Sequence, residues 1–84
     1  MGATQMNIYE TTFNSICPVN DQAIDYELRI ETLDMLMVEQ ILEKIEPFEL
    51  EPQYHEIIAD KLKELGGKQT LVAYHHGVKI TTIR

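Results

Sequence analysis

Residues 24–31 carry the clearest pattern in the chain, an alternation of apolar and charged side chains. The apolar set is Ile24, Tyr26, Leu28 and Ile30, and the charged set is Asp25, Glu27, Arg29 and Glu31. Successive side chains of a strand point to opposite faces, so a period of two predicts a strand with one covered face and one face in water.

A strand is also expected before this one, over residues 6–16, where Ile, Tyr, Thr and Phe are frequent. Residues 17–22 (CPVNDQ) then predict a turn, because Pro18, Asn20 and Asp21 favour turns.

The period changes to that of helices after residue 31. Val38, Ile41, Leu42 and Ile45 follow the i, i+3, i+4, i+7 spacing of an amphipathic helix. Asp34 is its expected N-cap, and Pro47 and Pro52 are expected to end it.

A second helix is expected to begin near Pro52, since proline is tolerated in a first turn. Its apolar stripe comprises Tyr54, Ile58, Leu62 and Leu65. Gly66 and Gly67 are expected to end it.

Two more strands are expected, over residues 68–76 and 78–83, with His76 and Gly77 as the central residues of a hairpin turn. The order ββααββ predicts an α+β fold, a four-stranded antiparallel sheet with two helices on one face. We expect residues 1–84 to form a single domain.

Composition narrows the class of protein. The net charge of −7 argues against autonomous binding to nucleic acid, which needs a basic patch, and favours a small molecule or a protein partner. No apolar run approaches the roughly 20 residues of a membrane span. The first ten residues lack the pattern of a signal peptide, and one cysteine allows no internal disulfide. We therefore expect a cytoplasmic protein, and its short chain favours a homo-oligomer.

Cys17 is the first candidate for chemistry. A lone cysteine is often a buried small side chain. It becomes a nucleophile where a neighbouring base or positive charge favours the thiolate. Asp21 and Asp25 follow within eight residues.

Two pairs of residues, His55 with Glu56 and His75 with His76, are the other candidates. Glu56 lies in the first turn of the expected second helix, where an acid is favourable by itself. Its two carboxylate oxygens can also accept parallel N–H bonds from a guanine-like or pterin-like edge. His75 and His76 are neighbours on a strand, so only one of them faces a given site.

Three stretches of the sequence resemble proteins of the tunnelling fold, whose members bind or convert purines and pterins. Residues 13–22 (FNSICPVNDQ) and 54–56 (YHE) resemble the nitrile reductase of queuosine biosynthesis, 7-cyano-7-deazaguanine reductase. This resemblance implies that Cys17 attacks the nitrile to form a thioimide, that Glu56 anchors the base and that His55 neighbours the substrate. Residues 53–77 resemble GTP cyclohydrolase I, which has a catalytic histidine where this chain has His75. From these resemblances we expect Cys17, Asp25 and His55 to be catalytic, and Glu56 and His75 to bind the substrate. The tunnelling fold also implies assembly through sheet edges, with sites between subunits.

The chain departs from both patterns. The reductase has its proton-donating aspartate where this chain has Ile24, and Asp25, the candidate here, comes one residue later. Residues 31–36 (ETLDML) lack the lysines and serines of the NADPH motif. Of the cyclohydrolase zinc ligands only Cys17 is matched, because Asn20 and Gly77 replace the others.

Three hypotheses follow. The chain is an enzyme of deazapurine metabolism that forms a thioimide at Cys17, a cyclohydrolase-like pterin protein, or a purine- or pterin-binding oligomer without turnover.

Overall fold

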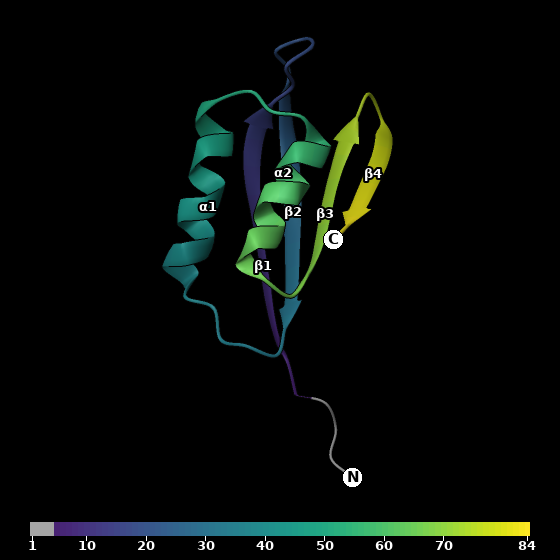
Figure 1. Ribbon diagram of the computed structural model, residues 1–84. Coiled ribbons are helices and arrows are strands. Elements are labelled where there is room, and N and C mark those ends of the chain that lie inside the picture. Colours follow the sequence, from purple (N-terminus) through teal and green to yellow (C-terminus); the bar gives the residue numbers. More distant parts are fainter. Residues whose placement is uncertain (1–4) are drawn as a thin grey trace.

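The computed structural model describes residues 5–84. The elements are β1 (Asn7–Ile16), β2 (Ala23–Thr32), α1 (Val38–Leu50), α2 (His55–Leu62), the 3₁₀ turn η1 (Lys63–Leu65), β3 (Lys68–His75) and β4 (Val78–Ile83). The strands form one antiparallel sheet in the order β1-β2-β3-β4, and both helices cover the same face of it (Figure 1). The predicted α+β class and ββααββ order are confirmed.

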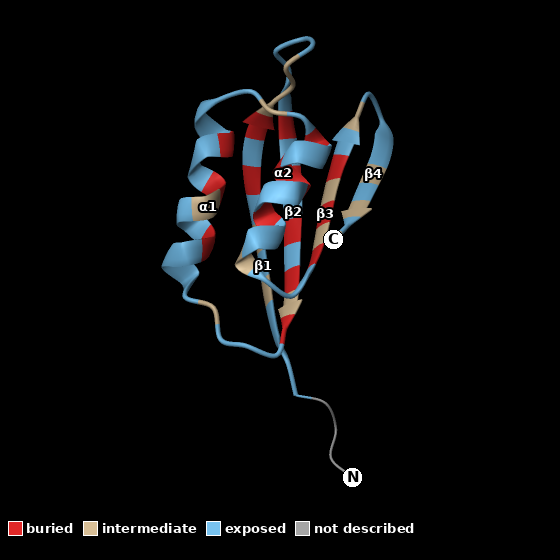
Figure 2. Ribbon diagram, in the orientation of Figure 1, coloured by how far each residue is buried: buried red, intermediate tan, exposed pale blue. Residues whose placement is uncertain are grey.

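The core lies between the sheet and the helices (Figure 2). The predicted alternation in β2 is confirmed, because its four apolar side chains, Ile24, Tyr26, Leu28 and Ile30, are all 6% exposed or less. Their charged neighbours point to the opposite, open face of the sheet. The other buried apolar residues are Phe13, Ile41, Ile45, Phe48, Ile58, Ala59, Leu62, Leu71 and Ala73.

The first helix begins and ends later than predicted. It starts at Val38, so the prediction of Asp34 as N-cap was wrong. Met37 occupies the cap position, and its N–H donates to the Gln40 side chain at 3.1 Å. Pro47 does not end the helix, which continues to Leu50.

Burial explains why α1 continues through Pro47. Proline removes one backbone donor from a helix, but Phe48 beyond it is only 4% exposed and holds the last turn against the core. Ile41, Ile45 and Phe48 form the buried stripe. Val38 and Leu42, predicted as part of that stripe, are 57% and 54% exposed.

The second helix begins at His55, three residues after Pro52. Tyr54 precedes the helix and is 52% exposed, whereas Ile58 and Leu62 of the predicted stripe are fully buried. Gly66 and Gly67 follow η1 with φ angles of 90° and 75°. A Cβ at residue 67 would lie 2.6 Å from the backbone oxygen of Glu31, so only glycine lets the chain pass this close to β2.

The predicted hairpin between β3 and β4 is confirmed. His75 pairs with Val78, which leaves His76 and Gly77 as a two-residue loop. Their φ angles of 51° and 81° are both positive, as a type I′ turn requires.

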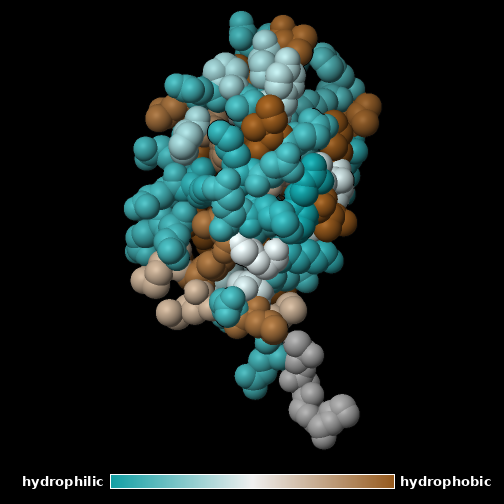
Figure 3. Space-filling model, in the orientation of Figure 1, coloured by the Kyte–Doolittle hydropathy of each residue, from teal (hydrophilic) through white to brown (hydrophobic). Residues whose placement is uncertain are grey.

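The surface over the helices is mostly hydrophilic, with hydrophobic side chains exposed at separated places (Figure 3). Within residues 5–84, the helices are too short or too polar for a membrane crossing.

Candidate functional site

Four of the five predicted site residues meet in one pocket of about 200 Å³. Cys17 comes from the β1–β2 loop, His55 and Glu56 from the start of α2, and His75 from the end of β3. The other lining residues are Pro18, Val19, Gln53, Tyr54 and Ile80. We call this hollow the Cys17 pocket.

The β1–β2 loop holds Cys17 by its backbone. The Cys17 N–H donates to the Gln22 carbonyl at 2.9 Å, and the Cys17 carbonyl accepts from the Asp21 N–H at 3.0 Å. Asp21 has a positive φ of 58°, which aspartate tolerates better than most residues. The Gln53 N–H donates to the Ile16 carbonyl at 3.3 Å, so the segment before α2 is tied to the residue before Cys17.

His55 forms part of the floor of the pocket and is 3% exposed. Its ring centre lies 5.3 Å from that of Tyr26 and 5.8 Å from that of His75. Burial lowers the pKa of His55 below its ordinary value of 6.5, and His75 lowers this pKa further. Glu56 and the Leu71 backbone act on the pKa of His55 in the raising direction, although neither His55 nitrogen has a hydrogen-bond partner. The ring is therefore neutral at pH 7 and gives a Cys17 thiolate no full positive charge.

Tyr26 lies beneath the same pocket, where sequence reasoning did not place it. It is fully buried, and its hydroxyl has no hydrogen-bond partner. Burial, and then the charges of Cys17 and Glu56, raise the pKa of Tyr26 to about 12. The hydroxyl therefore keeps its proton and remains a donor. A signal was present, because Tyr26 is the one member of the alternating apolar set Ile24, Tyr26, Leu28 and Ile30 that carries a polar group.

Unpartnered buried polar atoms gather around the pocket. Four of them are Tyr26 Oη, His55 Nδ1 and Nε2, and His75 Nε2, and Ser15 Oγ lies on the strand that leads to Cys17. One more, Gln69 Oε1, lies at the start of β3, away from the pocket. Buried polar atoms normally have a partner in the protein or in ordered water. Their concentration here marks a place where water or a ligand completes the hydrogen bonding.

Glu56 lies at the exposed rim of the pocket, in the first turn of α2. No side-chain hydrogen bond or ion pair within residues 5–84 engages its carboxylate. Both oxygens are therefore free to accept hydrogen bonds.

Asp25 and His76 do not join this group. Asp25 pairs with Asn14 and is exposed, next to the fully buried Tyr26. It therefore points to the open face of the sheet, as a shift of one residue along a strand requires. Of the two adjacent histidines, His75 faces the pocket, and His76 sits in the hairpin turn.

The segment at which the NADPH motif is expected lies away from the Cys17 pocket. Residues 31–36 comprise the last two residues of β2 and the start of the loop after it, at the opposite end of the sheet from Cys17 (Figure 1). Within residues 5–84 no group of three or more His, Cys, Asp or Glu side chains has the geometry to hold a metal ion.

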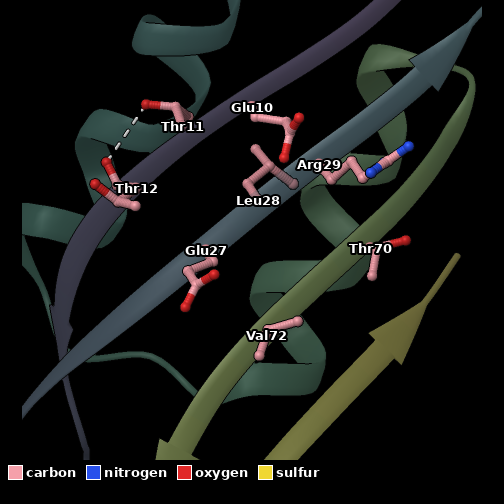
Figure 4. Close-up of a pocket in the computed structure, with 8 residues that line it drawn as sticks. All are labelled: Glu10, Thr11, Thr12, Glu27, Leu28, Arg29, Thr70 and Val72. Carbon is pink, nitrogen blue, oxygen red and sulfur yellow. Dashed lines mark hydrogen bonds between the residues drawn. The ribbon is translucent and has the colours of Figure 1, made fainter.

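A larger depression, of about 320 Å³, lies over the middle strands of the sheet. Figure 4 shows its lining, which comes from β1, β2 and β3 and includes Glu10, Glu27, Arg29 and Thr70. It contains no histidine or cysteine, so its size does not make it the better candidate for the predicted chemistry.

Comparison with protein-family models and with curated protein sequences gives no match. The fold is similar to the crystal structure of the archaeosine synthase QueF-Like in the apo form, with a TM-score of 0.83. The similarity covers 100% of this chain and 94% of that chain, at 19% sequence identity. At this identity the likeness shows the fold alone, and it confirms the tunnelling fold that the sequence resembles.

Proposed function

We propose that the chain binds a deazapurine in the Cys17 pocket and that Cys17 adds to a nitrile carried by this ligand. The observation that carries the proposal is that Cys17, His55, Glu56 and His75 come from three separate segments and line one pocket. Buried polar atoms of His55, His75 and Tyr26 have no hydrogen-bond partner there. A volume of about 200 Å³ is below the range of about 300–1,000 Å³ that is usual for drug-sized ligands, and it suits one bicyclic heterocycle.

Glu56 is the proposed anchor of the base. Its unengaged carboxylate can accept two parallel N–H bonds from the amidine-like edge of the ring, a charge-assisted pair. His75 and Tyr26 supply further polar groups next to Cys17, and the Tyr26 hydroxyl acts only as a neutral donor because its pKa is about 12.

The proposed reaction is an addition that needs no other reagent. The Cys17 sulfur bonds to the nitrile carbon, one C–N π bond opens, and the nitrogen takes up the proton that the thiol has lost. The product is a thioimide whose mass equals that of the protein plus the ligand. A neutral His55 can accept the thiol proton, since both of its nitrogens are unpartnered.

The residues of this chain do not fit the cofactors of the two resembled enzymes. Residues 31–36 offer no lysine or serine for the phosphates of NADPH. Zinc finds only Cys17 of its expected ligands, with Asn20 and Gly77 at the other positions. Neither reduction of the thioimide nor a metal-dependent step is therefore proposed.

Intact mass spectrometry tests the addition. Wild-type protein incubated with 7-cyano-7-deazaguanine is expected to gain the mass of the ligand under denaturing conditions. Cys17→Ala should lose this adduct while reversible binding remains measurable by calorimetry. Asp25→Asn is the matched control and should still form the adduct, because Asp25 points to the open face. Binding by the wild-type protein without any gain of mass would leave the chain as a purine binder without turnover.

We also infer self-association through the outer edges of β1 and β4, each of which pairs with only one strand. Ile8, Val38 and Leu42 line a hollow of about 310 Å³ between β1 and α1 and are exposed. An open strand edge flanked by apolar side chains favours pairing with another chain. Light scattering should show an oligomer that Leu42→Lys weakens and the control Leu50→Lys does not. A monomer at micromolar concentration contradicts the inference.

A further inference from the structure

A thioimide at Cys17 remains reactive, because its carbon is bonded to both sulfur and nitrogen and is still electrophilic. Reduction of this carbon needs a hydride donor, and residues 31–36 offer no lysine or serine for the phosphates of NADPH. Attack by water needs no cofactor motif. It needs only polar groups in the Cys17 pocket that can hold a water molecule and accept its proton.

We propose that the protein hydrates the nitrile, with a water molecule activated by His75 attacking the thioimide at Cys17 and releasing a carboxamide. The inference rests on the proposed function and adds a second half-reaction to it. Each round consumes one nitrile and one water molecule and returns the free Cys17 thiol.

The imidazoles of His55 and His75 provide polar partners for the water. Both rings line the Cys17 pocket, with their centres 5.8 Å apart. Both nitrogens of His55 and Nε2 of His75 are buried without a hydrogen-bond partner. A buried water molecule needs about 2–4 polar partners, so these nitrogens form a wall on which water can be held. A wall of apolar side chains would hold none.

His75 is better placed than His55 to activate this water. His55 is 3% exposed and is the proposed acceptor of the thiol proton. His75 is only half-buried, so water and protons can exchange between its ring and the solvent, although its Nε2 is buried. In the tautomer with the proton on Nδ1, Nε2 of His75 is an acceptor and can take a proton from water.

The hydration balances without an oxidant or a reductant. The water oxygen bonds to the imide carbon, the C–N π bond opens, and His75 passes the water proton to the nitrogen, which becomes an amino group. The C–S bond then breaks, the hydroxyl oxygen forms a carbonyl, and the hydroxyl proton returns to the sulfur through an imidazole. The carboxamide has the same oxidation level as the nitrile.

Sulfur is expected to leave in preference to nitrogen. A thiol is a stronger acid than an alkylammonium ion, so a thiolate is the weaker base and the better leaving group. Nitrogen leaves only after it takes up a further proton, and that route gives a thioester and then a carboxylic acid. The carboxamide is therefore the expected product.

Incubation with 7-cyano-7-deazaguanine in water labelled with heavy oxygen tests the proposal. The adduct is expected to appear first in intact mass spectra and then to decay. Chromatography with mass spectrometry should detect the carboxamide with one heavy oxygen atom, in excess over the protein. An incubation without protein measures the uncatalysed reaction.

His75→Gln separates hydration from addition. Glutamine keeps a polar side chain but is not a base, so the adduct should form as in the wild-type protein and decay about 100-fold more slowly or less, the lower end of general-base catalysis. A general loss of structure would reduce adduct formation as well. His76→Asn is the matched control, because it removes an imidazole outside the Cys17 pocket and keeps a favoured Asn-Gly turn. It should leave both steps unchanged.

Each other result overturns the inference in a different way. A stable adduct that releases no carboxamide refutes the hydration and leaves the addition to Cys17 as proposed. Equal decay in His75→Gln refutes the role of His75, and a carboxylic acid in place of the carboxamide refutes the release of sulfur. Carboxamide formed by Cys17→Ala refutes a route through the thioimide. If the wild-type protein gains no mass and forms no product, the proposed function fails and this inference fails with it.

Discussion

Tyr26→Phe is expected to stabilise the protein and to weaken its ligand binding. The Tyr26 hydroxyl is buried without a hydrogen-bond partner, so the folded protein loses the hydration of this group and gains nothing in return. Phenylalanine keeps the ring, which stacks on Phe13 with ring centres 5.1 Å apart. Only the unpaired oxygen is removed.

The size of the effect follows from the cost of an unsatisfied polar group. Leaving a buried donor or acceptor unpaired costs about 1–3 kcal/mol. Tyr26→Phe should therefore raise the free energy of unfolding by about 1 kcal/mol or more. In a chain of this size, about 1 kcal/mol corresponds to a rise in Tm of about 4–8 °C. If the hydroxyl donates to the bound ligand, the same change should weaken binding about two- to tenfold.

Tyr9→Phe provides the matched control. The Tyr9 hydroxyl accepts the Leu36 N–H at 2.9 Å, so this variant loses a hydrogen bond that the protein does make. It should lower the free energy of unfolding by about 0.5–1.5 kcal/mol. The two variants remove the same atom from the same residue type and should change Tm in opposite directions.

Thermal and urea unfolding of the three proteins, together with calorimetry of 7-deazaguanine binding, measure both effects. A drop in stability for Tyr26→Phe similar to that for Tyr9→Phe would mean that the Tyr26 hydroxyl is satisfied in the free protein, for example by a bound water. The Tyr26 hydroxyl would then no longer count among the unpartnered atoms that support a ligand site.

Three further predictions concern a close approach, a titration and the base anchor. Gly67→Ala should destabilise the fold by more than Gly66→Ala in urea unfolding, because both residues have positive φ but only a Cβ at residue 67 meets backbone, 2.6 Å from the Glu31 oxygen. His55 has a lowered pKa when folded, so the unfolded chain binds the proton more readily, and stability should fall as pH drops below about 6.5, by at most about 1.4 kcal/mol per pH unit. In His55→Gln this decrease of the free energy of unfolding at low pH should become smaller. An unchanged pH dependence would contradict its assignment to His55. Glu56→Gln should weaken 7-deazaguanine binding about tenfold through loss of the charge-assisted pair of hydrogen bonds. An unchanged dissociation constant by calorimetry would mean that Glu56 only stabilises the start of α2.

Local patterns in the sequence were enough to predict the order of the elements and the buried face of β2. The alternation over residues 24–31 defines the buried face of β2, and the positive φ angles of His76 and Gly77 match a turn predicted from two residue types. These features depend on neighbours in the chain, so a local pattern is enough to predict them. Cys17, His55, Glu56 and His75 were also found as candidates by residue type and by resemblance.

Which of these residues meet depends on contacts between segments that are distant in the chain. The alternation already separates Asp25 from Tyr26, but only the packing of α2 on the sheet brings His55 to Tyr26, with ring centres 5.3 Å apart. Pro47 stays inside α1 because the core holds Phe48, an effect that local helix rules do not contain. The lowered pKa of His55 likewise depends on burial and on His75, which is 20 residues away in sequence and 5.8 Å away between ring centres. Burial and charge are set by residues distant in the chain, so the electrostatics of the site follow from the packing of the helices on the sheet.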